Sequence, residues 1–157
     1  MRVGIGSDAH RFADGRPLVL GGVVVDHPLG LAGHSDGDVL SHAVVDAVLG
    51  AAGLGDIGTH FASTDDRWRD ASSDRFLERA RELVDGAGMR IVNVDAVVIC
   101  ESPRISPFRE KMQASIASSL GLDPTAVSVK GTTTDAMGST GRGEGIAAIA
   151  VALLQRS

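Results

Sequence analysis

The chain has 157 residues, a formal net charge of −5 and a hydrophobic fraction of 43%, which predicts one folded domain, 1–157, around a packed core. Aromatic residues make up only 3% and tyrosine is absent, so neither charge nor composition favours a nucleic-acid surface. The single cysteine, Cys100, excludes an intrachain disulfide, and the opening residues MRVGIG do not read as a signal peptide. We therefore expect a cytoplasmic protein with no nucleic-acid or membrane partner.

The first half of the chain is expected to hold a strand, a hairpin, a helix and a long loop. MRVGIGSDAH (1–10) predicts a strand, and two short apolar runs around a glycine pair in PLVLGGVVVDHP (17–28) predict a hairpin. HSDGDVLSHAVVDAVLGAAG (34–53) has apolar residues at helical spacing, with Ser35 as the expected N-cap. Residues 53–70 show no period and predict a loop, which at this length is typically functional.

The second half alternates helices and strands. Its amphipathic, β-branched and glycine-rich segments predict, in order, helix 71–88, strand 91–101, turn 101–108, helix 109–121, strand 126–131, loop 132–143 and a closing helix 144–155. This order predicts an α/β fold of the α+β two-layer sandwich type, with one mixed sheet, helices packed on one face and a small β-hairpin.

Two polar side chains in GSDAHRF (6–12) raise the question of a metal site. Asp8 and His10 are two residues apart on a strand and so point to the same side, although alone they also fit a polar strand end. His42, on the following helix, taken alone fits a capped core histidine better than a metal ligand, but with the other two residues it gives two nitrogens and one carboxylate. That donor set, with its fourth position open, is typical of catalytic zinc. Asp46, one turn after His42, is expected either to accept the other ring N–H or to face solvent.

Two glycine-rich loops are suited to phosphate. GHSDGD (33–38) opens a helix, and its backbone amides and His34 can donate hydrogen bonds to an anion; a capped loop with an exposed histidine is the alternative. KGTTTDAMGSTGRGEG (130–145) repeats this chemistry with hydroxyls and an arginine. Asp135 within it either binds a hard cation such as Mg²⁺ or is a turn residue bonded to its own backbone.

Three stretches in this order resemble the 2-C-methyl-D-erythritol 2,4-cyclodiphosphate synthase family over essentially the whole chain: GSDAHRF, GLAGHSDGDVLSHAVVDAVLGAAGLGDIG and KGTTTDAMGSTGRGEGIAAIAVALL. The resemblance implies a phosphorus–oxygen lyase of the non-mevalonate route to isoprenoid precursors. Such an enzyme converts 4-diphosphocytidyl-2-C-methyl-D-erythritol 2-phosphate into 2-C-methyl-D-erythritol 2,4-cyclodiphosphate and CMP. It also implies a homotrimer with active sites between subunits. An isoprenoid diphosphate would fit a central cavity, where Arg142 would contact it.

The resemblance further implies two metal ions. Zn²⁺ would be bound by Asp8, His10 and His42, and a second divalent cation, Mg²⁺ or Mn²⁺, by Asp135. The nucleophile is the substrate's own 2-phosphate, which is ionised at neutral pH, so the reaction needs charge neutralisation and positioning rather than a general base.

The same resemblance assigns the substrate-binding residues. His34 and Thr133 would stabilise the transferring phosphoryl group. The full set that would contact substrate is Asp8, Ala9, His10, His34, Ser35, Asp56, Ile57, Gly58, Phe61, Ala62, Ser63, Thr64, Asp65, Cys100, Glu101, Ser102, Pro103, Arg104, Ile105, Ser106, Thr132, Thr133, Thr134, Asp135, Ser139 and Arg142.

The sequence departs from the family pattern at three positions. Asp135 stands where Glu is frequent, Ser63 where Asp is frequent, and Ser139 where Phe is frequent. Two other functions also fit the residues: a phosphodiesterase that uses zinc-bound hydroxide and releases a linear product, and a non-catalytic trimer that binds isoprenoid diphosphates.

Overall fold

The computed structural model describes all of residues 1–157 and contains one five-stranded sheet, one two-stranded hairpin and five α-helices. The large sheet has the order β4-β1-β7-β5-β6; β5 and β6 are parallel, and the other neighbours are antiparallel. The elements are β1 Arg2–Ala13, β2 Leu18–Leu20, β3 Val23–Val25, β4 Gly30–Leu31, α1 Val39–Ala52, α2 Ile57–His60, the 3-10 helix η1 Asp66–Trp68, α3 Ser73–Gly86, β5 Met89–Ile99, α4 Arg109–Leu120, the 3-10 helix η2 Pro124–Ala126, β6 Val127–Thr132, α5 Gly138–Gly141 and β7 Gly145–Arg156.

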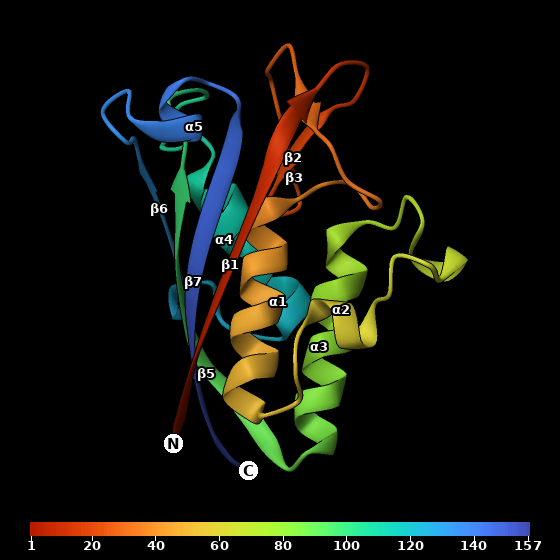
Figure 1. The fold of residues 1–157 in the computed structure, drawn as a ribbon. Helices are drawn as coiled ribbons and strands as arrows, with labels where there is room; N and C mark the ends of the chain where they lie inside the picture. The colour runs from red at the N-terminus through yellow and green to blue at the C-terminus, as the bar shows by residue number, and fades with distance from the viewer.

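The long helices lie on one face of the large sheet (Figure 1). α1 packs on β1 and β7, α4 packs on β6, and α3 lies between α1 and α4. Buried side chains from these helices and from the facing side of the sheet form one continuous core. The prediction of a mixed sheet with helices on one face and a small hairpin is therefore confirmed. None of the helices is both long enough and apolar enough to cross a membrane.

The predicted closing helix 144–155 is wrong, because this segment is the strand β7. It runs between β1 and β5 at the centre of the sheet and pairs with both. Small and branched apolar residues occupy both of its faces, which hides the strand period of two in the sequence. The alternation is visible only in the burial of every second side chain, at Ile146, Ala148, Ala150, Ala152 and Leu154.

Short elements lie where the sequence predicts only loops. α2 and η1 fall inside 53–70, α5 falls inside 132–143, and β4 precedes the GHSDGD loop. Each contains four residues or fewer. A periodic pattern cannot show over so short a span.

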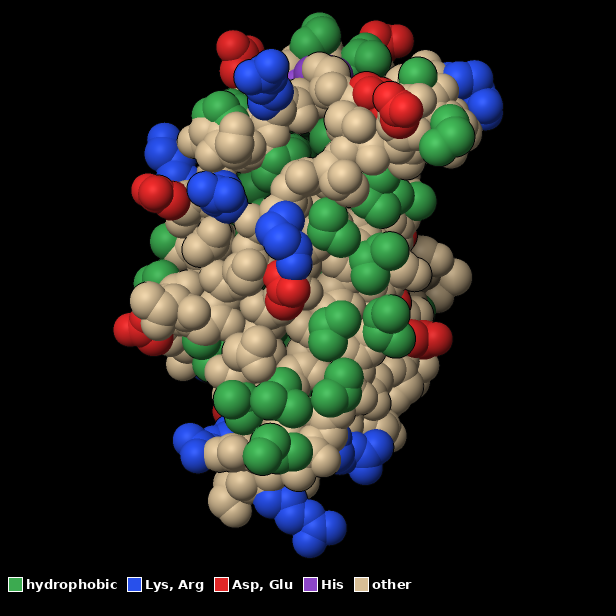
Figure 2. Space-filling model, turned by 90° about the vertical axis from the view of Figure 1, so that its left-hand side faces the viewer, with side chains coloured by type: hydrophobic (Ala, Val, Ile, Leu, Met, Phe, Trp, Pro, Cys, Tyr) green, Lys and Arg blue, Asp and Glu red, His purple; other side chains and the backbone are tan.

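The face of the sheet that the helices leave open is partly apolar. Figure 2 views this face, and hydrophobic side chains gather over its lower half. On β1 and β7, the side chains of Val3, Ile5, Ile149 and Val151 are 68%, 71%, 38% and 40% exposed. A contiguous exposed apolar patch is typical of an interaction surface.

Glycines on β1 allow α1 to lie directly against the strand. A Cβ atom at Gly4 would fall 2.0 Å from the Ala47 carbonyl oxygen, and one at Gly6 would fall 2.1 Å from the Ala43 carbonyl oxygen. No side chain fits at these distances, so the helix backbone rests on the strand backbone. This close approach places the first turn of α1 over the polar residues that follow Gly6 on β1.

Replacing Gly6 by alanine is expected to lower the free energy of unfolding by about 3 kcal/mol, the upper end of the usual cost of overpacking. The added methyl group meets helix backbone, which cannot turn aside as a side chain can. Denaturant unfolding measures the change. Gly86→Ala at the end of α3 is the control, because nothing lies within 4 Å of its Cβ position. Equal stability of the two variants would contradict the close approach.

Candidate metal and substrate site

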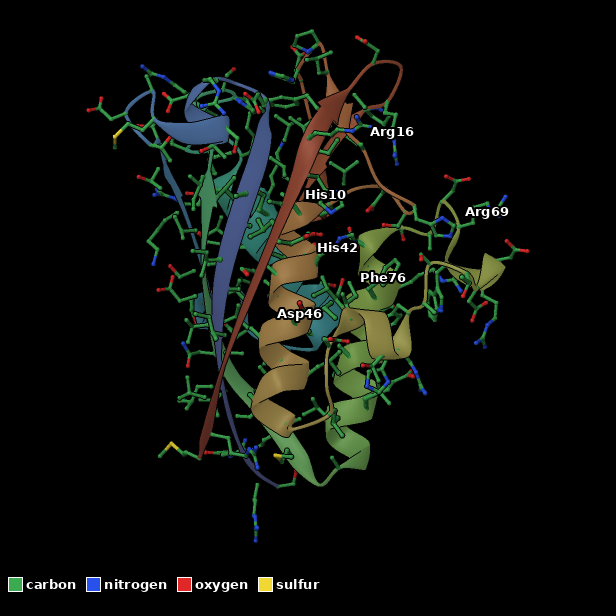
Figure 3. All side chains as sticks on the ribbon, viewed as in Figure 1. His10, Arg16, His42, Asp46, Arg69 and Phe76 are labelled. Carbon is green, nitrogen blue, oxygen red and sulfur yellow. The ribbon has the colours of Figure 1, made fainter.

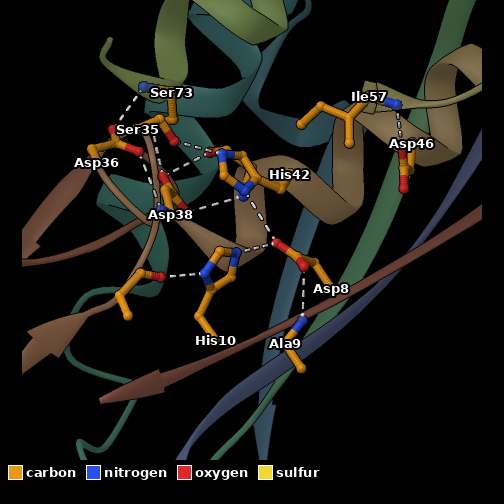
Figure 4. Close-up of polar contacts among 12 residues, drawn as sticks. Asp8, Ala9, His10, Ser35, Asp36, Asp38, His42, Asp46, Ile57 and Ser73 are labelled. Atoms are coloured by element: carbon orange, nitrogen blue, oxygen red, sulfur yellow. Dashed lines mark hydrogen bonds and ion pairs between the residues drawn. The ribbon is translucent and has the colours of Figure 1, made fainter. Parts of the chain in front are cut away.

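Asp8, His10 and His42 come together between β1 and the first turn of α1. The Asp8 Oδ2 atom lies 2.8 Å from His10 Nε2 and 3.1 Å from His42 Nδ1, and one potential ligand atom of each residue lies within 4.8 Å of the others. Figure 4 shows both imidazoles directed at the same carboxylate. One carboxylate oxygen and two imidazole nitrogens could hold a metal ion with one coordination position left for a ligand. The structure thus brings together the three predicted residues.

The second ring nitrogen of each histidine also has a partner. His10 Nδ1 donates to the carbonyl oxygen of Ala32, and His42 Nε2 lies 3.2 Å from Ser35 Oγ. A carbonyl only accepts, so the Nδ1 proton of His10 is fixed and Nε2 is the nitrogen left for a metal. Partners of this kind orient the imidazoles that bind a metal and raise their basicity. The fit of the donor set to a divalent metal is therefore good.

The partner of His42 Nε2 is Ser35, so of the two alternatives given for Asp46 the hydrogen bond to this ring nitrogen is wrong. Asp46 Oδ1 instead accepts from the Ile57 amide at 2.7 Å, which ties α1 to the start of α2. Figure 3 places Asp46 further along α1 than His42. Side chains four residues apart share a helix face, but here the ring of His42 turns toward the loop before the helix.

The N-cap of α1 is Asp38, and the prediction of Ser35 in that role is wrong. The helix begins at Val39, and the Asp38 carboxylate accepts from the amide of Ser41 at 3.0 Å. Asp38 is fully buried. Its carboxylate also joins three segments by accepting, at 2.7–2.8 Å, from Ser41 Oγ, Ser73 Oγ and the amides of Gly21 and Gly22. The sequence signal for this residue is an aspartate directly before the helical period.

The pKa values of Asp8 and His10 are both shifted by their neighbours in the cluster. Burial raises the pKa of the Asp8 carboxyl, but hydrogen bonds and charge from His10 and His42 outweigh burial and hold the pKa well below its usual range. The hydrogen bond to Asp8 raises the pKa of His10 above 6.5, although burial opposes it. Asp8 therefore stays ionised, and the cluster without a metal holds a proton on His10 more tightly than a free histidine does.

Zinc affinity is expected to fall with falling pH, by about tenfold per pH unit for each proton displaced. The fall begins at the raised pKa of His10, so it sets in above the pH at which an ordinary histidine would start to compete. The same proton stabilises the metal-free fold fully below the ordinary histidine pKa of 6.5, and this contribution is lost as pH rises through the raised value. Competition with a chromophoric chelator across pH measures the affinity, and a flat profile would contradict the coupling.

The cluster opens into a cavity of about 290 Å³ with an apolar wall. Phe61, Trp68 and Phe76 form the wall, with ring centroids 4.8–5.2 Å apart. Trp68 and Phe76 are not among the predicted site residues. The feature of the sequence that could have indicated them is that three of its few aromatic residues, Phe61, Trp68 and Phe76, fall within or just after the 53–70 segment. The cavity is lined by Asp8, His10, His34, Ser35, His42, Ile57, Gly58, Phe61, Ser63, Trp68 and Phe76. A ligand here would meet apolar rings on one side and the metal cluster on the other.

Some predicted residues of the 53–70 segment do not line this cavity. Asp56 caps α2, where its Oδ1 atom accepts from the Thr59 amide at 2.8 Å. Asp65 pairs with Arg67, with Nη2 and Oδ2 2.6 Å apart. Ala62 and Thr64 are exposed and also lie outside the cavity lining.

A second, larger cavity of about 430 Å³ lies near the end of β6. It is lined by Cys100, Glu101, Pro103, Arg104, Ile105, Ser106, Arg109, Lys130, Gly131, Thr132 and Thr133. Most of the residues expected to hold the cytidine part are thus brought together, with three cations beside them. Burial, and to a lesser extent the charge of Glu101, raises the pKa of the Cys100 thiol to about 11, so this cysteine is protonated and not a nucleophile.

The remaining predicted residues line neither of these two cavities; they are Ala9, Ser102, Thr134, Asp135, Ser139 and Arg142. The Glu101 carboxylate accepts from the amides of Thr134 and Ala136 and so holds the loop after β6. Asp135 has a φ of +54° and lies outside the metal cluster. A small cavity of about 160 Å³ is lined by Ala9, His10, Arg11, Ser139, Thr140, Glu144, Gly145 and Ile146. Arg142 pairs with Glu144 at 2.6 Å, and Ser102 lines a separate cavity beside Thr140.

Comparison with known proteins gives consistent matches over the whole chain. The profile of the YgbB family matches residues 1–155. A 2-C-methyl-D-erythritol 2,4-cyclodiphosphate synthase of Rubrobacter xylanophilus is 60% identical over 99% of this chain and 96% of its own length. The bifunctional IspDF of Campylobacter jejuni superposes with a TM-score of 0.95 at 42% identity, over 99% of this chain and 42% of that chain. A CDP-bound form of such a synthase superposes at 0.89 with 36% identity, over 98% of this chain and 100% of that chain.

Proposed function

Since the chain belongs to the YgbB family of 2-C-methyl-D-erythritol 2,4-cyclodiphosphate synthases, we propose that it forms this cyclic diphosphate from 4-diphosphocytidyl-2-C-methyl-D-erythritol 2-phosphate. The second product is CMP, and the enzyme acts as a phosphorus–oxygen lyase. The observation that carries the proposal is the metal cluster of Asp8, His10 and His42, which opens into the same cavity as His34. A phosphate-facing donor and a metal cluster in one cavity suit an intramolecular attack on a diphosphate.

Different residues of the metal cavity would have different roles in this reaction. Asp8, His10 and His42 would hold a zinc ion, which would supply Lewis-acid stabilisation of the diphosphate charge. His34, in the same cavity, donates a hydrogen bond to the phosphoryl group as its charge grows. The aromatic wall packs against the methylerythritol carbons and excludes water, which favours attack by the 2-phosphate over hydrolysis. The reaction needs no general base from either cavity, because the attacking 2-phosphate of the substrate is already ionised at neutral pH.

The cytidine end of the substrate belongs in the second cavity, beside Thr132 and Thr133. Thr133 is proposed to donate its hydroxyl proton in a hydrogen bond to the transferring phosphoryl group. Asp135, two residues further on, would hold Mg²⁺ or Mn²⁺, which would neutralise part of the diphosphate charge. The side chain of Asp135 is one methylene shorter than that of a glutamate. To reach the same ion, the backbone must lie closer to it, and the left-handed conformation of Asp135 would have to provide this approach.

A homotrimer would bring the two cavities together. They share no lining residue within one chain, yet a single substrate must reach both. The open apolar face of the sheet supplies a surface for association, and three copies around an axis would enclose a cavity between them (Figure 2). An isoprenoid diphosphate would fit there, with Arg142 at its phosphate end. Ser139 makes that cavity more polar than a phenylalanine would.

Phosphorus NMR of the reaction with the diphosphocytidyl substrate tests the function. A cyclic diphosphate together with CMP supports the synthase. A linear bisphosphate would instead identify a zinc phosphodiesterase, and binding of isoprenoid diphosphates without turnover would identify a non-catalytic trimer. Either of these two results would overturn the proposal.

A further inference from the structure

We propose that Arg16 is a positioning residue for the site, because its guanidinium group holds the loop that carries His34 and orients both imidazoles of the metal cluster. The inference rests on the proposed function. Arg16 lies between β1 and β2, outside every residue set considered so far. Figure 3 shows it near His10, on the side of the sheet that carries the helices.

The guanidinium group of Arg16 forms hydrogen bonds with the loop on both sides of His34. Arg16 Nη1 donates to the Gly33 carbonyl at 2.7 Å, and Nη2 donates to the Ser35 carbonyl. These two carbonyls flank the residue proposed to stabilise the phosphoryl group. Two N–H donors on one rigid plane, each bonded to a different carbonyl, fix the path of the loop in a way that a single ammonium group cannot.

The loop of residues 32–35 is in contact with both imidazoles. The Ala32 carbonyl accepts from His10 Nδ1, and Ser35 Oγ lies 3.2 Å from His42 Nε2. A Cβ atom at Gly33 would lie 3.4 Å from the ring of His10, so the loop backbone lies close to that imidazole. A displacement of this loop would therefore reach both histidines.

Arg16 supplies half of the hydrogen bonds that hold the carbonyls of this loop. The partners of the four carbonyls of residues 32–35 are, in order, His10 Nδ1, Arg16 Nη1, the amide of Asp70 at 3.2 Å and Arg16 Nη2. Without Arg16, the carbonyls of Gly33 and Ser35 lose the partners that fix their direction. The His34 ring and the Ser35 hydroxyl would then sample several positions.

The test compares Arg16→Ala and Arg16→Lys with the wild type, and with Arg79→Ala as a control on the exposed face of α3. Arg79 pairs with Glu82 at 2.8 Å and lies outside both cavities. We expect Arg16→Ala to lower kcat by about 10–100-fold, the range found when groups behind metal ligands are lost, and to weaken zinc binding by about tenfold, the lower end of that range. Arg16→Lys keeps the positive charge but can reach only one of the two carbonyls, so we expect its kcat to lie between those of the wild type and Arg16→Ala. Guanidinium added to Arg16→Ala restores part of the lost kcat.

The readouts separate a positioning role from a general structural one. Zinc affinity by chelator competition and the visible spectrum of the Co²⁺-loaded protein report the two imidazoles without any turnover. They remain informative if the wild type forms no cyclic product, a result that would defeat the proposed function alone. The positioning role is overturned if Arg16→Ala keeps the wild-type zinc affinity and Co²⁺ spectrum. It is also overturned if Arg16→Lys matches the wild type in kcat, because charge alone would then suffice.

Discussion

Replacing His42 by alanine is expected to lower kcat at least about 1000-fold and to remove tight zinc binding. The side chain is one of only three that form the cluster, and its Nδ1 atom lies 3.1 Å from Asp8 Oδ2. Loss of a metal that stabilises developing phosphoryl charge costs several kcal/mol of transition-state stabilisation, and about 4 kcal/mol corresponds to a thousandfold in rate. Product formation by phosphorus NMR and zinc content by atomic absorption measure the two effects.

His27→Gln is the matched control for this variant. His27 is half-buried, whereas His42 is buried, and its Nδ1 atom lies 2.8 Å from the Leu29 carbonyl oxygen. It stacks on Phe12 and lies outside the metal cavity. It should keep full zinc content and turnover. Full zinc occupancy and turnover in His42→Ala would show that the ligand assignment is wrong.

Mixing two inactive variants is expected to restore about one quarter of the wild-type activity. His42→Ala damages the metal cavity, and Thr133→Ala damages the other cavity, and the two cavities share no lining residue. In randomly mixed trimers of the proposed kind, each site would take one cavity from each of two neighbours. Each of those cavities is intact with a probability of about one half, so about a quarter of the sites are complete.

The experiment requires coexpression or joint refolding, followed by a turnover assay against each variant alone. Variants assembled separately and combined without subunit exchange are the control and should show no gain. If each active site lay within one chain, joint assembly would give no more activity than the sum of the parents. That outcome would contradict the proposed arrangement of sites between subunits.

The metal cluster was predictable only in part from the residues themselves. Asp8 and His10 lie two apart on a strand and so share a face, but residue type and period left a polar strand end and a core histidine open, and the family resemblance identified His42 as the third member. The partners of the ring nitrogens were not predictable. Ser35 and Ala32 reach the imidazoles through the path of an irregular loop, and no periodic pattern encodes such a path.

The fold was predictable to a similar degree. Helices with one apolar face, such as α3, were placed correctly because their period matches their burial. β7 was not, because the alternation that defines a strand disappears when both faces carry apolar residues. Arg16 was missed for a third reason: its role depends on two carbonyls that only the folded chain brings within reach.

The central position of β7 has a consequence for synthesis of the protein on the ribosome. β7 follows every other element in the sequence but lies between β1 and β5 in the sheet. Until it emerges from the exit tunnel, the facing edges of β1 and β5 have no partner, and unpaired strand edges are prone to aggregate. The emerging chain is therefore expected to expose two strand edges until β7 inserts, even though the three residues of the candidate metal cluster are synthesised long before.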